Sequence, residues 1–98
     1  MSDLVKWLRQ QFNADEQAAP NVHALDCELT MTAGFSGPCT CGWADRLLAE
    51  VDADRAILDL YEQTEFGDLS RRTALEDVIR LRALPRADRP GYRPEWRP

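Results

Sequence analysis

Residues 43–62 read Trp43-Ala-Asp-Arg-Leu-Leu-Ala-Glu-Val-Asp-Ala-Asp-Arg-Ala-Ile-Leu-Asp-Leu-Tyr-Glu62, and this stretch decides the fold. Its apolar residues recur at intervals of three and four, which places them on one face of an α-helix. This apolar stripe comprises Trp43, Leu47, Leu48, Val51, Ile57, Leu58 and Tyr61. The charged residues fall largely on the other faces: Asp45, Glu50, Asp52, Asp54, Arg55, Asp59 and Glu62. The pattern predicts a helix over about 43–65, which Gly67 ends.

An earlier helix is predicted over about 3–19. Its apolar residues again recur at helical spacing, and they are Leu4, Val5, Leu8 and Phe12. Ser2 or Asp3 is placed to cap the first turn, and Pro20 ends the helix.

A third helix is predicted over about 70–84, before Pro85. Its start is open between Asp68 or Ser70 and the capping box Thr73-x-x-Glu76. Arg71 and Arg72 would lie unfavourably near the positive end of the helix dipole in a first turn, which favours the later start. The expected buried face comprises Leu75, Val78, Ile79 and either Leu81 or Leu84. We therefore predict an all-α fold, a small three-helix domain that includes the whole of residues 1–98.

The end of the chain, residues 85–98, contains Pro85, Pro90, Pro94 and Pro98. Prolines at this density predict an extended tail. Tyr92 and Trp96 are spaced to dock the tail on the helices, because buried aromatic rings contribute large apolar contacts. A free tail that presents both rings to a partner is the alternative.

The segment 21–42 has neither helical nor strand periodicity, yet it contains all three cysteines and the only histidine. So long an irregular connection is uncommon in a small domain and calls for an internal crosslink. His23, Cys27, Cys39 and Cys41 could supply the one nitrogen and three thiolates of a closed, structural Zn²⁺ site. His23 and Cys27 are one helical turn apart, whereas the Cys-x-Cys spacing of Cys39 and Cys41 is less usual than Cys-x-x-Cys.

Three other interpretations of these residues stay open. The cysteines could be reduced and unliganded, as in many cytosolic proteins, or two of them could form a disulfide and leave one thiol over. His23 and Cys27 could also form a nucleophilic dyad, oriented by Asp26. Zinc is favoured because a chain this short gains little from burial, whereas structural zinc contributes roughly 10–16 kcal/mol in peptide systems.

Length and composition bound the class of protein. A chain of 98 residues supports one domain, and its 44% apolar and 30% charged residues match a soluble globular protein and not a disordered one. No stretch approaches the roughly 20 apolar residues of a transmembrane helix, and the first residues do not resemble a signal peptide. We therefore expect a cytoplasmic protein.

The net charge of −5 is unevenly distributed. Residues 1–70 carry 4 Lys and Arg against 13 Asp and Glu, whereas residues 71–98 carry 8 Arg against 4 acidic residues. The arginines could pair with the acidic helix of their own chain, or they could contact phosphates or a partner protein. A sequence pI near 4.7 argues against a dedicated nucleic-acid binder.

Catalytic motifs are absent from the sequence. It contains no Gly-rich phosphate loop and no Gly-x-Ser-x-Gly turn, and its single histidine belongs to the cysteine cluster. The carboxylates of residues 43–62 are most simply a solvated helix face. We therefore expect a protein that is not an enzyme.

The ending Ala83-Leu-Pro-Arg-Ala-Asp-Arg-Pro-Gly-Tyr-Arg-Pro-Glu-Trp-Arg-Pro98 has a specific pattern, ALP-x-AD-x-P-x-Y-x-x-EWRP. Together with the opening residues 3–9 and the middle residues 44–58, it resembles a family of short proteins from Streptomyces, related actinobacteria and their bacteriophages. That family is a domain of unknown function. Its members often carry His and Cys between the first two helices or before the third, so the resemblance is in keeping with a metal site and implies a phage-related context.

We expect a small zinc-binding interaction or regulatory protein that binds a host or phage protein. Two surfaces are candidate contacts, the acidic face of the middle helix and the Arg-aromatic tail. Their residues are Glu50, Asp52, Asp54 and Asp59, and Arg86, Arg89, Tyr92, Arg93 and Trp96. The alternative is a nucleic-acid-binding module in which arginines of the last third contact phosphates. Those arginines are Arg71, Arg72, Arg80, Arg82, Arg86, Arg89 and Arg93.

Overall fold

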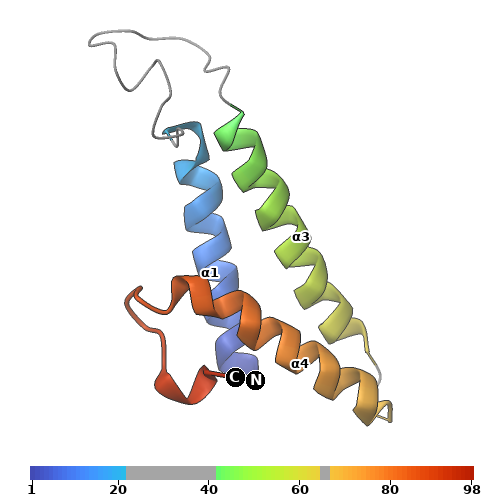
Figure 1. Ribbon diagram of the computed structural model, residues 1–98. Helices are drawn as coiled ribbons and strands as arrows, with labels where there is room; N and C mark the ends of the chain where they lie inside the picture. Colours follow the sequence, from blue (N-terminus) through green and yellow to red (C-terminus); the bar gives the residue numbers. More distant parts are fainter. Residues whose placement is uncertain (22–41, 65–66) are drawn as a thin grey trace, which may run out of the picture.

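The computed structural model describes residues 1–21, 42–64 and 67–98, which form three α-helices and no strand (Figure 1). The helices are α1 (Ser2–Ala18), α3 (Trp43–Gln63) and α4 (Leu69–Ala83). Short 3₁₀ turns follow α1 and α4 and precede the C-terminus: η1 (Ala19–Asn21), η2 (Leu84–Arg86) and η3 (Pro94–Trp96). The all-α, three-helix prediction is confirmed for these residues. None of them belongs to a helix with a long enough apolar run to cross a membrane.

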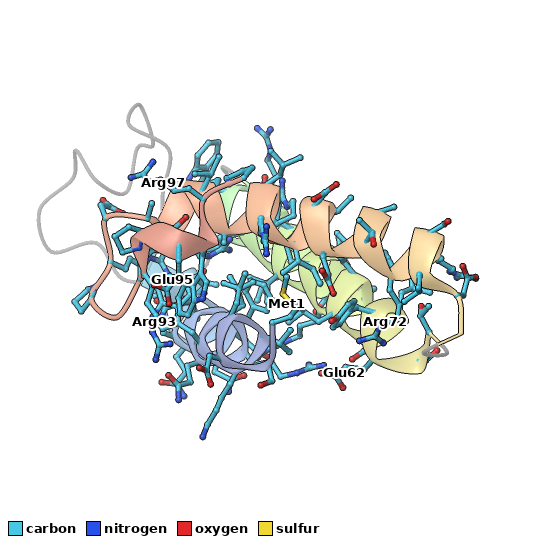
Figure 2. All side chains as sticks on the ribbon, turned by 90° about the horizontal axis from the view of Figure 1, so that it is seen from below. Met1, Glu62, Arg72, Arg93, Glu95 and Arg97 are labelled. Carbon is cyan, nitrogen blue, oxygen red and sulfur yellow. The ribbon has the colours of Figure 1, made fainter. Side chains whose placement is uncertain are left out.

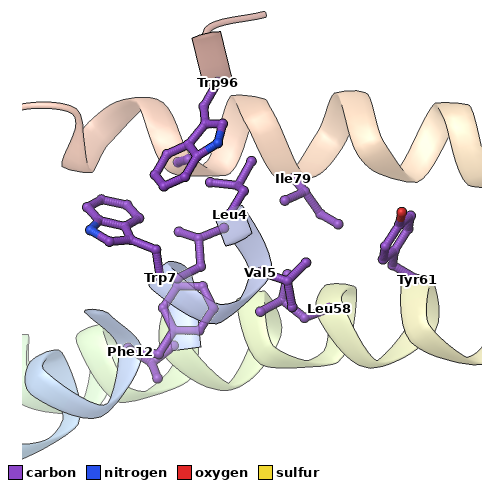
Figure 3. Close-up of a cluster of buried hydrophobic side chains, with 11 residues drawn as sticks. Leu4, Val5, Trp7, Phe12, Leu58, Tyr61, Ile79 and Trp96 are labelled. Atoms are coloured by element: carbon purple, nitrogen blue, oxygen red, sulfur yellow. The ribbon is translucent and has the colours of Figure 1, made fainter. Parts of the chain in front are cut away.

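Helices α1 and α3 run side by side in opposite directions, and α4 crosses them (Figure 1). The predicted stripe of α1 is buried: Leu4 and Leu8 are 0% exposed and Phe12 is 1% exposed. Figure 3 shows Val5 of α1 facing Leu58 of α3, with further core residues from α4 and the C-terminal turn. The predicted cap is wrong, because Ser2 and Asp3 lie inside the first turn of α1 and Met1 occupies the N-cap position without a side-chain hydrogen bond.

Helix α3 buries fewer apolar residues than its sequence predicts. It also buries one acidic residue, whose burial the apolar pattern does not predict. Val51, Leu58 and Tyr61 are buried, whereas Trp43, at the N-terminal end, is 41% exposed. Asp54 is 2% exposed, because it lies three residues after Val51 and four before Leu58 and therefore on the same face. The helix ends at Gln63, and Thr64 is already extended.

Helix α4 starts at Leu69, four residues before the favoured Thr73, so the later start is wrong. The Asp68 carboxylate caps the helix by accepting a hydrogen bond of 3.1 Å from the backbone N–H of Arg71. The Arg72 guanidinium donates back to the carbonyl oxygen of Thr64 at 3.1 Å. Its positive charge therefore lies against the end of α3 and away from the positive end of the α4 dipole, so the unfavourable interaction with that dipole is reduced.

The buried face of α4 is narrower than predicted. Ile79 is 1% exposed, Ala83 is fully buried and Leu75 packs against the core, whereas Val78 and Leu81 are 37% and 55% exposed. The last two therefore face solvent, because α4 covers α1 and α3 with one side only.

The C-terminal segment is not the extended tail that its prolines predict. Pro85 and Pro94 occupy early positions of the turns η2 and η3, where a fixed φ and a missing N–H are tolerated. Trp7 packs against both Tyr92 and Trp96, with ring centroids 5.7 Å and 5.5 Å apart, and its indole N–H donates to the carbonyl oxygen of Pro90 at 3.0 Å. The segment thus folds back over the start of α1, and the two termini lie close together (Figure 1).

Candidate interaction surfaces

Five charged residues join α1 and α3 to the end of α4. We call them the buried ionic cluster because its central residues Asp15, Asp54 and Arg86 are buried, whereas Arg82 and Arg89 are partly exposed. The members are Asp15, Asp54, Arg82, Arg86 and Arg89. The Arg86 guanidinium lies 3.1 Å from the Asp15 carboxylate and 3.6 Å from that of Asp54. Arg82 binds Asp54 through two hydrogen bonds of 2.7 and 3.2 Å, and Arg89 lies 2.9 Å from Asp15. Hydrogen bonding to Asp54 raises the pKa of Arg82. The cluster therefore keeps two carboxylates paired in the interior.

Ion pairs outside the core extend the same pattern. Arg93 reaches Asp3 at 3.1 Å, and Arg55 of α3 reaches Glu16 of α1 at 2.7 Å. Of the two interpretations of the charge asymmetry, pairing within the chain is therefore the one that these contacts support. The partners lie on α1 as well as on the acidic helix α3.

Several residues predicted to contact a partner are instead interior. Asp54, Arg86 and Trp96 are 2%, 7% and 9% exposed, so they are corrected to structural residues of the ionic cluster and the aromatic core. Arg89 and Tyr92 are partly buried in the same region. The residues that stay on the surface are Glu50, Asp52, Asp59 and Arg93, of which Asp52, Asp59 and Arg93 are engaged in ion pairs. The structure brings neither predicted surface together as an unbroken patch.

A surface that the sequence did not indicate is an open groove of about 580 Å³ at the N-terminal end of α1. The groove is lined by Met1, Ser2, Val5, Lys6, Arg9, Tyr61, Glu62 and Arg72. Figure 2 shows Met1 between α1 and α4, with Glu62 and Arg72 on the side of α3. In Figure 1, α1 and α3 diverge towards this end of the molecule. The groove therefore lies where α1 and α3 move apart.

The rim of the groove is held by polar contacts between helices. Arg9 of α1 donates to Asp59 at 3.0 Å and to Glu62 at 2.9 Å, and these hydrogen bonds, the one to Glu62 first, raise the pKa of Arg9. The Tyr61 hydroxyl donates to Glu76 at 2.9 Å and accepts from Arg72 at 2.9 Å. Burial first, and the bond to Glu76 second, raise the pKa of Tyr61. These contacts position one wall of the groove.

Lys6 also lines the groove but, unlike Arg9, makes no ion pair among the described residues. It is exposed on the rim. Its charge can therefore be met by a ligand.

The proposed zinc ligands His23, Cys27, Cys39 and Cys41 lie outside the described residues. Within the described ranges no three His, Cys, Asp or Glu side chains are grouped closely enough to hold a metal ion. The segment that carries the ligands is anchored at both ends by described elements, η1 on one side and α3 on the other, and these two elements contact each other.

One family accounts for the whole of this chain, since its sequence profile matches residues 1–98. The chain belongs to DUF6221, a family of unknown function. The buried ionic cluster and the groove are therefore features of a DUF6221 protein, and both lie within the matched region. Searches of curated proteins and of solved structures gave no match to the chain.

Proposed function

We propose that this DUF6221 chain is a small, non-enzymatic protein that acts by binding another protein in the cytoplasm. The proposal rests on a difference between two parts of the surface: the arginines of the last third are paired within the chain, whereas the groove at the start of α1 is open. Four arginines of the last third are engaged by carboxylates of the same chain, namely Arg82, Arg86, Arg89 and Arg93. The groove at the start of α1 is open and has an apolar floor. An exposed apolar concavity on an otherwise charged chain is typical of a docking site.

The same ion pairs weigh against the nucleic-acid alternative. A phosphate-binding surface needs several cations that face solvent and are not already neutralised. In this chain Arg86 is buried, and Arg82 and Arg89 bind carboxylates at 2.7 and 2.9 Å. We therefore expect no shift of duplex or single-stranded DNA or RNA in a gel at low salt, where even non-specific binders are retained.

We further propose that Zn²⁺ is a structural cofactor, bound by ligands from residues 21–42. The contact between η1 and α3 supports it, because both ends of the segment begin at one end of the helix pair (Figure 1). His23 and Cys27 follow the first anchor, and Cys39 and Cys41 precede the second. Four ligands that start from adjacent anchors need only short excursions to meet at one ion. The lineage implied by the C-terminal ending, actinobacteria and their phages, makes a host or phage protein the proposed partner.

Site-specific photocrosslinking tests the proposed binding surface. A benzophenone amino acid is placed at Ser2 or Lys6 in the groove, and at two exposed control positions, Asp52 on α3 and Leu81 on α4. We expect one protein adduct of defined mass from the groove positions in native cells and none from the controls. Adducts that arise only at the controls, or only with nucleic acid, would show that the proposal is wrong.

A further inference from the structure

We propose that one face of α1 recognises a segment of the partner protein that contains proline, arginine and an aromatic anchor. The chain's own C-terminal segment, residues 87–98, occupies this face, and the partner segment binds by displacing it. The inference rests on the proposed protein-binding function and names the chemistry that the partner presents. The face lies across α1 from the groove: Figure 2 shows Arg93 on one side of this helix and Glu62 on the opposite side.

The polar part of the site is a ridge of α1, whose residues follow one another at intervals of four. We call it the recognition ridge, and its residues are Asp3, Trp7, Gln11 and Asp15. Arg89 lies 2.9 Å from Asp15 and donates to Gln11 at 3.3 Å. The Trp7 indole N–H donates to the carbonyl oxygen of Pro90 at 3.0 Å, and Arg93 donates to Asp3 at 3.1 Å. Every residue of the ridge therefore has a polar contact with the resident segment.

An aromatic anchor fixes the end of the segment. Trp96 is 9% exposed, and Figure 3 shows its ring near Leu4 and Trp7 of α1. The ring centroid of Trp96 is 5.5 Å from that of Trp7 and 5.6 Å from that of Tyr92. Buried tryptophans of this kind dominate the energy of many interfaces, and surfaces lined by aromatic rings are a recurring way to bind proline-rich segments.

The same contacts define the sequence that a partner segment presents. Gly91 has a φ of +90°, and a Cβ atom there would lie 2.7 Å from the indole nitrogen of Trp7, so this position requires glycine. Pro94 begins the turn η3, which carries the anchor Trp96. We therefore expect the pattern Arg-Pro-Gly-aromatic-Arg-Pro-x-Trp, as in residues 89–96.

The resident segment leaves one group of the site unsatisfied. The hydroxyl of Tyr92 is buried and has no hydrogen-bond partner among the residues that the structure describes. A buried hydroxyl without a partner weakens the docking of the segment that carries it. A partner segment with Phe at this position makes the same ring contacts without that penalty, so it binds more tightly than the resident segment.

The attachment of the resident segment permits its release. The segment ends the chain, and chain ends open locally at a low cost in free energy. The ion pair of Arg93 with Asp3 is exposed, with 51% and 68% of the two side chains accessible, so it contributes little. Release uncovers the ring of Trp7 together with the recognition ridge, and an exposed apolar surface of this kind marks an interaction site.

Displacement by a peptide tests the inference in the full chain, labelled with ¹⁵N in its tryptophan indoles. The probe is the unlabelled peptide of residues 88–98 with Tyr92→Phe. The three indole N–H signals report different events. Trp96 belongs to the displaced segment, Trp7 belongs to the ridge, and Trp43 lies at the N-terminal end of α3.

We expect the peptide to move the Trp96 signal to the position of a free indole and to leave Trp43 in place. The Trp7 N–H stays hydrogen-bonded, because it now donates to the peptide. The tethered segment has an effective concentration of about 1 mM or more, so the peptide of native sequence should reach half displacement at millimolar concentration. The Tyr92→Phe peptide should need about tenfold less, and a peptide that also carries Gly91→Ala should displace nothing at about 10 mM.

Two full-chain variants provide a matched comparison. Arg93→Gln removes the ion pair with Asp3, so the same peptide should displace the segment at a concentration about threefold lower. Arg97→Gln makes the same change in charge on an exposed side chain of the same segment. Arg97 has no ion pair within the described ranges and lies 6.0 Å from the ring of Tyr92, so its replacement should leave the midpoint unchanged within about 1.5-fold.

Three outcomes would overturn the inference: no movement of the Trp96 signal at about 10 mM of the Tyr92→Phe peptide, equal potency of the Gly91→Ala peptide, or movement of Trp43 together with Trp96. A dimer in native mass spectrometry that Arg93→Gln weakens would assign the ridge to a second copy and overturn it as well. If photocrosslinks still form at Ser2 and Lys6 in any of these cases, the proposed function stands and only the partner segment is wrong.

Discussion

The guanidinium of Arg86 donates a hydrogen bond of 3.1 Å to the carboxylate of Asp15, 71 residues earlier in the chain, and both side chains are buried. The same guanidinium lies 3.6 Å from Asp54 on α3 and 5.0 Å above the ring of Phe12. One side chain therefore joins the start of the C-terminal segment to α1 and α3 together. Arginine suits this position because its planar fork can address two carboxylates at once.

Replacing Arg86 should lower the free energy of unfolding, because the buried carboxylates of Asp15 and Asp54 each lose one of their cationic partners. In Arg86→Met, Asp15 keeps Arg89 and Asp54 keeps Arg82, so we expect a loss of about 3 kcal/mol in the free energy of unfolding. Arg86→Lys should fall between this variant and the native chain, because one ammonium cannot bridge both carboxylates. Urea unfolding followed by circular dichroism measures the loss. Arg93→Ala removes an exposed pair and should cost under about 1 kcal/mol, so equal losses in the two variants would contradict the central role of Arg86.

Gly91 allows the C-terminal segment to pass close to Trp7. Its φ of +90° lies in the region that favours glycine, and a Cβ atom there would lie 2.7 Å from the indole nitrogen of Trp7. We expect Gly91→Ala to lower the free energy of unfolding by about 2 kcal/mol or more and to quench or shift the tryptophan fluorescence. Gly42→Ala is the control, because Gly42 has a φ of +74° with no atom near the added Cβ. An equal loss in both would mean that backbone strain, and not the contact with Trp7, is the cause.

The hydroxyl of Tyr92 is buried and has no hydrogen-bond partner among the residues that the structure describes. Removing it should therefore release a desolvation penalty without breaking a bond. We expect Tyr92→Phe to unfold at the same urea concentration as the native chain or at a higher one. A loss above about 1 kcal/mol would instead indicate a bond from this hydroxyl to water or to the remaining residues.

Tyr61 should titrate above its ordinary pKa of 10.0, since burial and the bond to Glu76 both favour its neutral form. The stabilisation that this gives is complete below pH 10.0 and is lost as the pH rises through the higher pKa of the folded state. In the Tyr92→Phe background Tyr61 is the only tyrosine, so tyrosinate absorbance reports it directly. Glu76→Gln should lower the midpoint part of the way, because burial is the larger cause. A folded midpoint at or below that of the urea-unfolded chain would contradict the assignment.

Helix positions could be predicted from the sequence because apolar spacing and proline carry that information locally. Residues 43–65 and 3–19 were predicted within two residues of α3 and α1 at each end. The start of α4 is not predictable in this way, because the helix-dipole rule treats the charge of Arg72 as lying at the helix end, whereas its side chain reaches Thr64 and Tyr61. A long side chain can carry its charge about a helical turn away from its own backbone.

The buried ionic cluster left a signal that apolar periodicity alone does not detect. Asp15 lies three residues after Phe12, and Asp54 lies three after Val51, each on the buried face of its helix. Arg86 likewise follows Ala83 by three. Two acids and one arginine at buried positions of three separate segments predict a pairing, because an isolated buried charge is too costly. The groove, in contrast, depends on how α1 and α3 diverge at the N-terminal end of α1, which only the tertiary arrangement determines.

Cys39→Ser tests the proposed zinc site. If His23, Cys27, Cys39 and Cys41 hold one ion, native mass spectrometry should find one zinc per chain, and the variant should lose it together with several degrees of thermal stability. Asp26→Asn is the matched control, because Asp26 lies in the same segment and is not a proposed ligand. A chelator should reproduce the Cys39→Ser result in the native chain. If the native chain is metal-free and melts at the same temperature with and without chelator, zinc does not hold this segment, and the thiols are open to the redox and nucleophilic interpretations.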